Sequence, residues 1–156
     1  MRTLYFKKVI ASMVVAAVLL ACIKQTDTNE APAIVGTWKL LSGTLVDKGD
    51  TTVTDYTQGV SFIKIINDTH FAFIQHDLKG GKDSTTAVFT AGGGTYTLKE
   101  NTYTENLEYC NARKWEGHHF SFTIEIKNDT LVQKGIEKVE SANIERLNIE
   151  KYVRMK

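Results

Sequence analysis

The chain has 156 residues, of which 42% are apolar and 24% are charged, values that are ordinary for a globular protein and exclude extended disorder. Its 19 Lys and Arg side chains are nearly balanced by 18 Asp and Glu side chains. A nucleic-acid-binding protein needs a basic surface to neutralise phosphates, so we predict no nucleic-acid partner. A single proline and 11 glycines exclude collagen-like and proline-rich chains.

The first 21 residues are typical of an export signal that is removed from the mature protein. Arg2, Lys7 and Lys8 precede an apolar run over residues 9–20, which is shorter than the ~20 residues of a membrane-spanning helix. Cleavage leaves 135 residues, enough for one domain with a hydrophobic core. Three of the 19 basic side chains and none of the 18 acidic ones lie in the signal, so the mature part has a formal charge of −2.

The signal ends in Leu19-Leu20-Ala21-Cys22, which resembles the lipobox of bacterial lipoproteins. The resemblance implies that residues 1–21 are cleaved and that Cys22 is acylated on its sulfur and on the new N-terminus. In the lipoproteins of enteric bacteria, Asp directly after the lipidated cysteine favours the inner membrane. By this resemblance, Ile23 at that position favours the outer membrane. The polar stretch within residues 22–33 is predicted to be a flexible tether between the lipid and the domain. The alternative is an ordinary signal peptide with a chance cysteine.

The two cysteines are not predicted to pair. A lipidated Cys22 leaves Cys110 without an intramolecular partner, which excludes a structural disulfide even in an oxidising compartment. No clear base neighbours Cys110 in the sequence. We therefore interpret it as a half-buried small hydrophobic residue, with a reactive nucleophile as the alternative.

From Ile34 onward, apolar and polar residues alternate with period two, which is typical of β-strands. The predicted strands cover about residues 36–46, 59–67, 69–76, 84–91, 94–99, 102–110, 118–127, 130–135 and 145–154. Turn residues separate them at 67–68, 80–81, 92–94, 100–101 and 128–129. Only residues 135–147 have a pattern that suits a short helix.

This pattern predicts an all-β fold in a single domain over residues 34–156. Short successive hairpins favour an up-and-down antiparallel order, and eight or nine strands in one open sheet would leave two exposed edges. Closure into a barrel removes both edges and leaves room inside for side chains or one small ligand. A two-sheet sandwich is the alternative architecture.

Alternation in the second half of the domain assigns an inner face, and we predict that aromatic and polar side chains on it contact a ligand. These candidate contacts are Tyr96, Tyr103, Glu105, Tyr109, His118, Phe120 and Phe122. Glu105 is the least expected member, because a carboxylate inside a small barrel is costly unless it is paired. It is interpreted either as an anchor for a ligand head group or as part of a structural ion pair or network with an Arg or Tyr. In the first half, Phe62 and Ile63 place apolar groups on both faces.

Gly36-Thr37-Trp38 opens the first predicted strand and resembles the Gly-x-Trp motif of lipocalins and fatty-acid-binding proteins. The resemblance implies that Trp38 packs at the closed end of a barrel under an Arg from the last strand, with Arg154 and Arg146 as candidates. Three further stretches, at 69–73, 91–98 and 102–105, resemble the lipocalin-like lipoproteins of Gram-negative bacteria. This likeness covers nearly all of residues 34–154. It implies a calycin-type barrel and an envelope location, and it implies no reaction.

Patterns for catalysis and metal binding are missing from the sequence. His118 and His119 are adjacent and would point to opposite faces of a strand, and neither completes a recognisable metal-ligand spacing. Gly92-Gly93-Gly94 has no following helix that would make it a phosphate loop, so we interpret it as a hairpin turn. Trp115 is interpreted as covering the barrel mouth or packing on its rim. We predict no cofactor and no metal.

We predict first a lipid-anchored, monomeric, lipocalin-like protein that binds a small, partly apolar ligand inside the barrel. On this hypothesis Glu105→Ala abolishes ligand retention while the fold survives. The second hypothesis is a structural or protein-interaction module whose barrel is filled by its own side chains. The third is an acid–base enzyme that uses Glu105, Tyr103, Tyr109 and His118. A lumen under roughly 100 Å³ would favour the second over the first, because ligand pockets are typically ~300 Å³ upward.

Overall fold

The alternating pattern folds into nine strands in the computed structural model, which describes residues 33–156. The strands are β1 (Gly36–Asp47), β2 (Asp50–Asp55), β3 (Val60–Ile66), β4 (His70–Asp77), β5 (Phe89–Lys99), β6 (Thr102–Cys110), β7 (His118–Lys127), β8 (Thr130–Val139) and β9 (Ile144–Arg154). Two short 3₁₀ helices within the described residues are η1 (Arg113–Trp115) and η2 (Glu140–Ala142). The predicted signal, Cys22 and the tether up to residue 32 lie outside the described residues.

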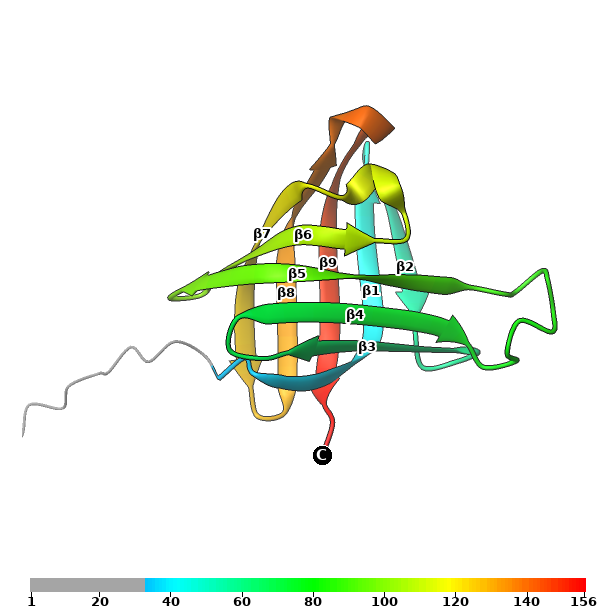
Figure 1. Cartoon of the computed structure of the whole chain (residues 1–156), viewed down its shortest axis with the longest axis horizontal. Helices are drawn as coiled ribbons and strands as arrows, with labels where there is room; N and C mark the ends of the chain where they lie inside the picture. The colour runs from blue at the N-terminus through cyan, green and yellow to red at the C-terminus, as the bar shows by residue number, and fades with distance from the viewer. Residues whose placement is uncertain (1–32) are drawn as a thin grey trace, which may run out of the picture.

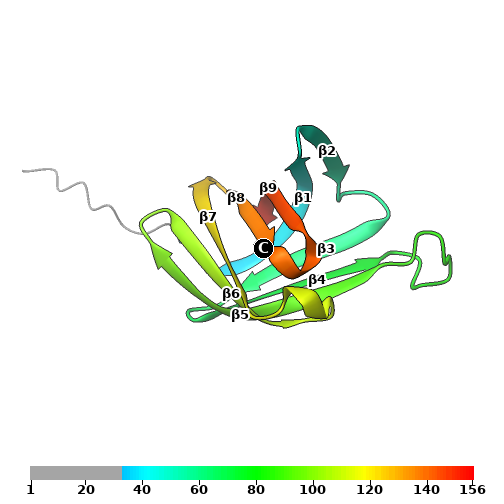
Figure 2. The same ribbon diagram turned by 90° about the horizontal axis from the view of Figure 1, so that it is seen from above.

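Neighbouring strands pair antiparallel around the sheet, and β1 pairs with β9 to close it. The result is a closed eight-stranded barrel with β2 as an additional strand. The long strand β1 pairs with two strands along the same edge. Its first half pairs with β3, and its second half pairs with β2. In Figure 1, β3–β6 run across β1, β7, β8 and β9, and Figure 2 shows this arrangement from above. The predicted up-and-down barrel is therefore confirmed, and its closure excludes the two-sheet sandwich.

Trp38, near the start of β1, is fully buried. Its indole Nε1 donates a hydrogen bond of 2.8 Å to the Ile34 carbonyl. The Arg154 guanidinium lies 4.1 Å from the centroid of the Trp38 ring and donates to the carbonyls of two residues that precede β1, at 2.7 and 2.6 Å. A side chain at Gly36, whose φ is +147°, would collide with Arg154. Arg154, from the last strand, thus lies over Trp38, the contact that the family resemblance implies.

We expect Arg154→Ala to lower the free energy of unfolding by about 2 kcal/mol, because it removes a cation–π contact and two charge-assisted hydrogen bonds. Arg154→Lys keeps the charge but lacks the planar guanidinium, so it should recover only part of this loss. Urea unfolding followed by circular dichroism measures both variants. A loss for Arg154→Ala below about 0.5 kcal/mol, typical of an ordinary surface substitution, would contradict the role given to Arg154.

Three segments differ from the predicted strands. Residues 50–55, expected in a loop, form β2, in which every residue is exposed, so no apolar alternation marks it. Residues 84–88, expected in a strand, lie in the β4–β5 loop, and β5 begins only at Phe89. Residues 136–139, expected in a helical stretch, extend β8, and the helix that follows is the single turn η2.

The predicted hairpin turn at Gly92-Gly93-Gly94 is wrong, because these glycines lie inside β5. The backbones of β4 and β6 approach them so closely that a side chain would not fit. A Cβ at Gly93 would lie 2.6 Å from the Phe71 carbonyl oxygen, and one at Gly94 would overlap the Asn106 carbonyl oxygen. The glycines therefore permit the backbones of the neighbouring strands to approach closely, which a larger residue would prevent.

A β-bulge in β6 turns Tyr109 away from the lumen. The register with β5 shifts by one residue between Leu107 and Tyr109, which makes Glu108 an additional residue on this strand. The alternation reverses there, so that Leu107 and Cys110 are buried while Tyr109 is 68% exposed. The predicted inward position of Tyr109 is therefore wrong. Cys110 is a free, buried thiol, in line with its interpretation as a small hydrophobic residue.

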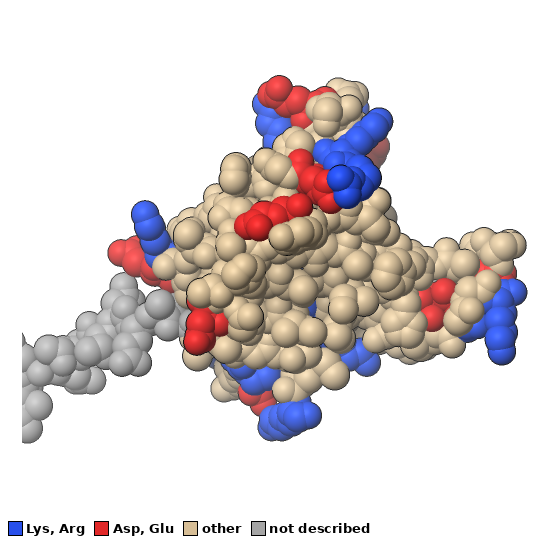
Figure 3. Space-filling view, in the orientation of Figure 1, with Lys and Arg blue, Asp and Glu red and all other residues tan. Residues whose placement is uncertain are grey.

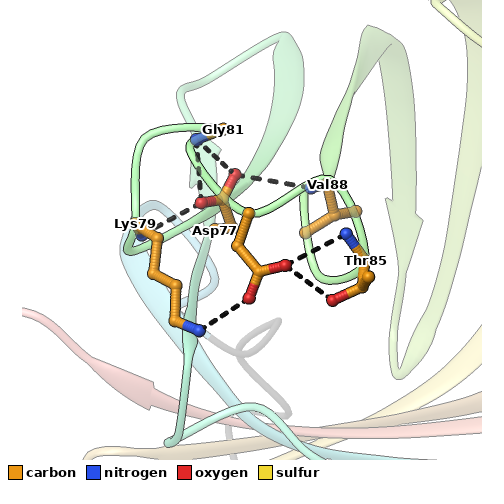
Figure 4. A network of polar contacts seen from close by, with 6 residues as sticks. Asp77, Lys79, Gly81, Thr85 and Val88 are labelled. Atoms are coloured by element: carbon orange, nitrogen blue, oxygen red, sulfur yellow. Dashed lines mark hydrogen bonds and ion pairs between the residues drawn. The ribbon is translucent and has the colours of Figure 1, made fainter.

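Two aspartates organise the β4–β5 loop, residues 78–88 (Figure 4). The Asp77 carboxylate accepts hydrogen bonds from backbone N–H groups, namely those of Lys79, Gly81 and Val88. Asp83 accepts hydrogen bonds from the Thr85 hydroxyl at 2.6 Å and from the Lys79 ammonium at 2.9 Å. These donors lower the pKa of Asp83 to about 2. Both carboxylates are thus occupied by N–H and O–H donors, which hold the loop together.

Candidate binding site inside the barrel

A connected group of polar side chains occupies the centre of the barrel, a position that normally holds apolar residues. It begins at Lys64 on β3, whose side chain is 3% exposed. The Lys64 ammonium forms an ion pair of 2.7 Å with the Glu105 carboxylate on β6. It also donates a hydrogen bond of 3.0 Å to Oε1 of Gln133 on β8. Three strands that are distant in sequence are thereby joined across the lumen.

Aromatic rings surround the Lys64 ammonium. Its Nζ lies 5.9 Å from the ring centroids of Phe71 and Tyr103 and 5.3 Å from that of Tyr152. The negative faces of such rings attract a cation, and the rings shield it from water. Glu105 is buried, so its predicted inward position is confirmed. Its partner is a lysine, where the sequence had suggested an Arg or Tyr.

Gln133 extends the network to β9. Its Nε2 donates a hydrogen bond of 2.7 Å to Oε2 of Glu150, and the same oxygen accepts the Tyr152 hydroxyl at 2.7 Å. Both of these donors are neutral. Within residues 33–156, Glu150 forms no ion pair with a Lys, Arg or His side chain.

A second charged pair lies between β8 and β9. The Glu137 carboxylate accepts hydrogen bonds from Nε of Arg146 at 2.8 Å and from Nδ2 of Asn148 at 2.7 Å. The Arg146 guanidinium lies 5.3 Å from the centroid of the Trp115 ring, which η1 supplies. Arg146 therefore does not cover Trp38, and its assignment to the barrel-closing motif is wrong. The β8–β9 register explains its place, because residues 137 and 146 are directly opposite each other.

A cavity of about 100 Å³ lies among these side chains. Its polar wall consists of Lys64, Glu105, Gln133, Glu137 and Glu150, and its apolar wall of Phe62, Phe73, Leu107, Trp115, Phe120, Phe122 and Tyr152. An engineered apolar cavity of about 150 Å³ holds benzene, so this one holds about three waters or a molecule of fewer than about six non-hydrogen atoms. A drug-sized ligand needs ~300 Å³ or more and does not fit.

Burial raises the pKa of Glu105 and of Glu137, and the neighbouring cations Lys64 and Arg146 offset only part of this effect. The folded barrel therefore holds these two protons more tightly than the unfolded chain does. By linkage, their contribution to stability is largest below the ordinary glutamate pKa of 4.5 and decreases as the pH rises through the raised values.

We expect the free energy of unfolding to decrease through these two groups as the pH rises above the ordinary glutamate pKa of 4.5. Glu137→Gln removes one of them and should show a shallower decrease, whereas Glu125→Gln, on the exposed face of β7, should keep the wild-type slope. Asp77 and Asp83 have lowered pKa values and act in the opposite sense, but only around and below their ordinary value of 3.8. Urea unfolding at several pH values measures the slopes, and equal slopes for wild type and Glu137→Gln would contradict the prediction.

Four of the predicted contact residues belong to the lumen. Glu105, Phe120 and Phe122 line the cavity. Tyr103 is fully buried near Glu105, and its hydroxyl makes no hydrogen bond of regular geometry with any residue of the described chain. Burial, together with the adjacent Glu105 carboxylate, raises the pKa of Tyr103 far above its ordinary value. Trp115, for which two positions were open, is part of the cavity wall.

The other three predicted contacts lie away from the cavity. Tyr96 packs on Tyr103 with ring centroids 5.2 Å apart, and its hydroxyl donates to a backbone carbonyl at 2.8 Å. His118 stacks on Phe120, and its Nδ1 lies 3.1 and 3.2 Å from backbone carbonyl oxygens of the η1 segment. Tyr109 is outside the barrel. Of the predicted acid–base group, the structure therefore brings Tyr103 and Glu105 together, whereas Tyr109 and His118 lie elsewhere.

Sequence reasoning missed most of the polar network, namely Lys64, Gln133, Glu137, Asn148, Glu150 and Tyr152. In β9 the inward positions carry Asn148, Glu150 and Tyr152, whereas the outer face carries Leu147, Ile149 and Val153. The inner face is therefore the more polar one, and hydropathy gives the wrong orientation. A weak signal exists in β3, where Lys64 stands between Phe62 and Ile66 at alternate positions. A lysine in the middle of an apolar face is unusual unless it is paired.

The sequence matches no protein-family model and no curated protein. The barrel itself is consistent with the lipocalin-like fold that the sequence motifs imply. Within residues 33–156, no group of three or more His, Cys, Asp or Glu side chains is placed to hold a metal ion. In the same part of the chain, none of the helices has the length and apolar character needed to cross a membrane.

Proposed function

We propose that the barrel binds one small, compact molecule in the cavity beside Glu105. The observation that carries this proposal is a cavity of about 100 Å³ that brings aromatic walls together with several placed polar groups. Ligand sites in proteins usually combine these two kinds of wall. The volume narrows the ligand expected from the sequence, because only a molecule of fewer than about six non-hydrogen atoms fits.

NMR titration of the full chain with small alcohols and amines tests this proposal. We expect chemical-shift changes at the Trp115 indole and the Gln133 amide, because both residues line the cavity. Leu107→Phe adds volume to the cavity wall and should abolish these changes, while circular dichroism confirms that the variant is folded. The absence of shifts at the cavity residues with every probe would contradict the proposal.

We further infer that the protein is a lipoprotein, held by Cys22 in the outer membrane of a Gram-negative bacterium. The support is the signal-like segment and the lipobox-like Leu19-Leu20-Ala21-Cys22. Three acyl chains of roughly 14–16 carbons, at ~0.8 kcal/mol per methylene, would make the attachment effectively permanent. Mass spectrometry of the membrane-extracted protein should find an acylated Cys22 at the N-terminus, and Cys22→Ser should remove the modification. An unmodified N-terminus at another residue would contradict this inference.

A second candidate function, that of a protein-interaction module, is favoured by the outer face of β3–β6. Figure 3 shows that few charged side chains lie at the centre of this face. Large exposed apolar side chains lie on it, namely Ile65, Ile74, Phe89 and Tyr109. A shallow groove of about 530 Å³ includes Ile74 and Tyr109. Exposed apolar patches of this kind often mark interaction surfaces.

Photo-crosslinking in the cell envelope tests the second candidate. A photo-reactive residue at position 109 should form a discrete crosslinked product, and the same residue at position 125, on the exposed face of β7, should not. Equal crosslinking from both positions, or none from position 109, would count against this function.

A further inference from the structure

The charged groups of the lumen are unequal in number. The network contains three carboxylates and two cations, namely Glu105, Glu137, Glu150, Lys64 and Arg146. Lys64 pairs with Glu105 at 2.7 Å, and Arg146 pairs with Glu137 at 2.8 Å. Glu150 is left with the Gln133 amide and the Tyr152 hydroxyl as its donors within the described residues.

The two internal cations are held by the same combination of groups. The Lys64 ammonium contacts a carboxylate and has three aromatic rings within 5.9 Å. The Arg146 guanidinium contacts a carboxylate and lies 5.3 Å from the centroid of the Trp115 ring. A carboxylate combined with aromatic rings is therefore how this lumen accommodates positive charge. Glu150 and the rings of Phe62, Phe73 and Trp115 line one cavity. Lys64 also lines this cavity, but its ammonium is already paired with Glu105.

We infer that the cavity selects a small organic cation, a protonated amine or a guanidinium compound, whose N–H groups bind Glu150. This inference rests on the proposed function, because it names the chemical class of ligand for the same cavity. The cation would supply the charge that Glu150 lacks, and its short apolar part would lie on the aromatic wall. A neutral alcohol of equal size would supply a hydrogen bond without the charge. An anion would add a fourth negative charge to a part-buried site that already contains three carboxylates, and it would be excluded.

Propylammonium, 1-propanol and propionate are matched probes, because they are similar in size and differ in charge. We expect NMR titration of the full chain at neutral pH to give at least tenfold tighter binding of propylammonium than of 1-propanol, and no binding of propionate. Glu150→Gln keeps an oxygen that accepts the hydrogen bonds from Gln133 and Tyr152, and it removes the charge. It should reduce the preference for propylammonium to less than twofold. Glu125→Gln removes the same charge from an exposed site and should leave the preference unchanged.

The outcomes separate this inference from the function on which it rests. Shifts at cavity residues without a preference for charge, or a preference that Glu150→Gln leaves intact, overturn the cation class while binding in the cavity stands. No shift with any of the three probes overturns both. The unfolding midpoint shows whether Glu150→Gln is folded. If that variant does not fold, the ratio of affinities for propylammonium and 1-propanol in the wild type decides the question.

Discussion

Lys64→Met is expected to lower the free energy of unfolding by about 3–5 kcal/mol, the usual effect of removing one partner from a buried ion pair. Methionine has a similar length and no charge. The substitution therefore leaves the Glu105 carboxylate, which is 6% exposed, without a cation, and it removes the donor to Gln133. A small domain has about 5–15 kcal/mol of stability in total, so the variant should be close to unfolding. Urea unfolding of the full chain measures the change.

The double variant Lys64→Met/Glu105→Leu should recover most of this loss, because it removes both buried charges and fills their space with apolar atoms. Lys79→Met is the matched control. The Lys79 side chain is 62% exposed in its ion pair with Asp83, and its loss should change stability little. Equal effects of Lys64→Met and Lys79→Met would show that burial does not strengthen the Lys64–Glu105 pair.

Because Lys64 and Glu105 form a buried ion pair, a substitution at Glu105 cannot test ligand binding separately from stability. The sequence suggested that Glu105→Ala would abolish ligand retention in a protein that still folds. Because Lys64 is buried against Glu105, that variant leaves an ammonium group without a carboxylate, and stability falls together with binding. Glu150 is the better residue for a binding test, since a glutamine there can keep both hydrogen bonds that the carboxylate accepts.

Alternation predicted the inner faces of β6 and β7 correctly wherever the pleat is regular. Tyr103, Phe120 and Phe122 are buried because each strand has one apolar face and one polar face. The prediction fails at Tyr109, where the bulge adds a residue and moves the following side chain to the other face. Hydropathy carries no mark of such an insertion.

The polar network could not be predicted, because the inner face of a strand is recognised by its apolar residues and the members of the network are polar. Lys64 binds residues that are 41 and 69 positions away in the sequence, Glu105 and Gln133. These side chains meet only when the barrel has closed and the register of every strand is fixed. The contact between Trp38 and Arg154 was easier to predict from the sequence. Trp38 lies in a short motif, and Arg154 is one of two arginines in the last strand.

Gly94→Ala is expected to lower the free energy of unfolding by about 3 kcal/mol, the upper range for overpacking. The new Cβ would overlap the Asn106 carbonyl oxygen and would lie 2.8 Å from the Glu108 nitrogen. Both are backbone atoms of β6, so no change of rotamer relieves the contact, and β5 and β6 must move apart. Because β6 also carries Glu105, the cavity wall should move with it, and urea unfolding together with NMR shifts at Gln133 reports both effects.

Gly49→Ala is the control that separates close approach from backbone conformation. Gly49 has a φ of +93° and no atom within 4 Å of the position of a Cβ. An alanine there is strained only through its backbone, at about 1–2 kcal/mol. If residues 92–94 acted as a turn, the two substitutions would have similar effects. If Gly94→Ala lowers the free energy of unfolding no more than Gly49→Ala does, the backbones of β5 and β6 are not in close contact at Gly94.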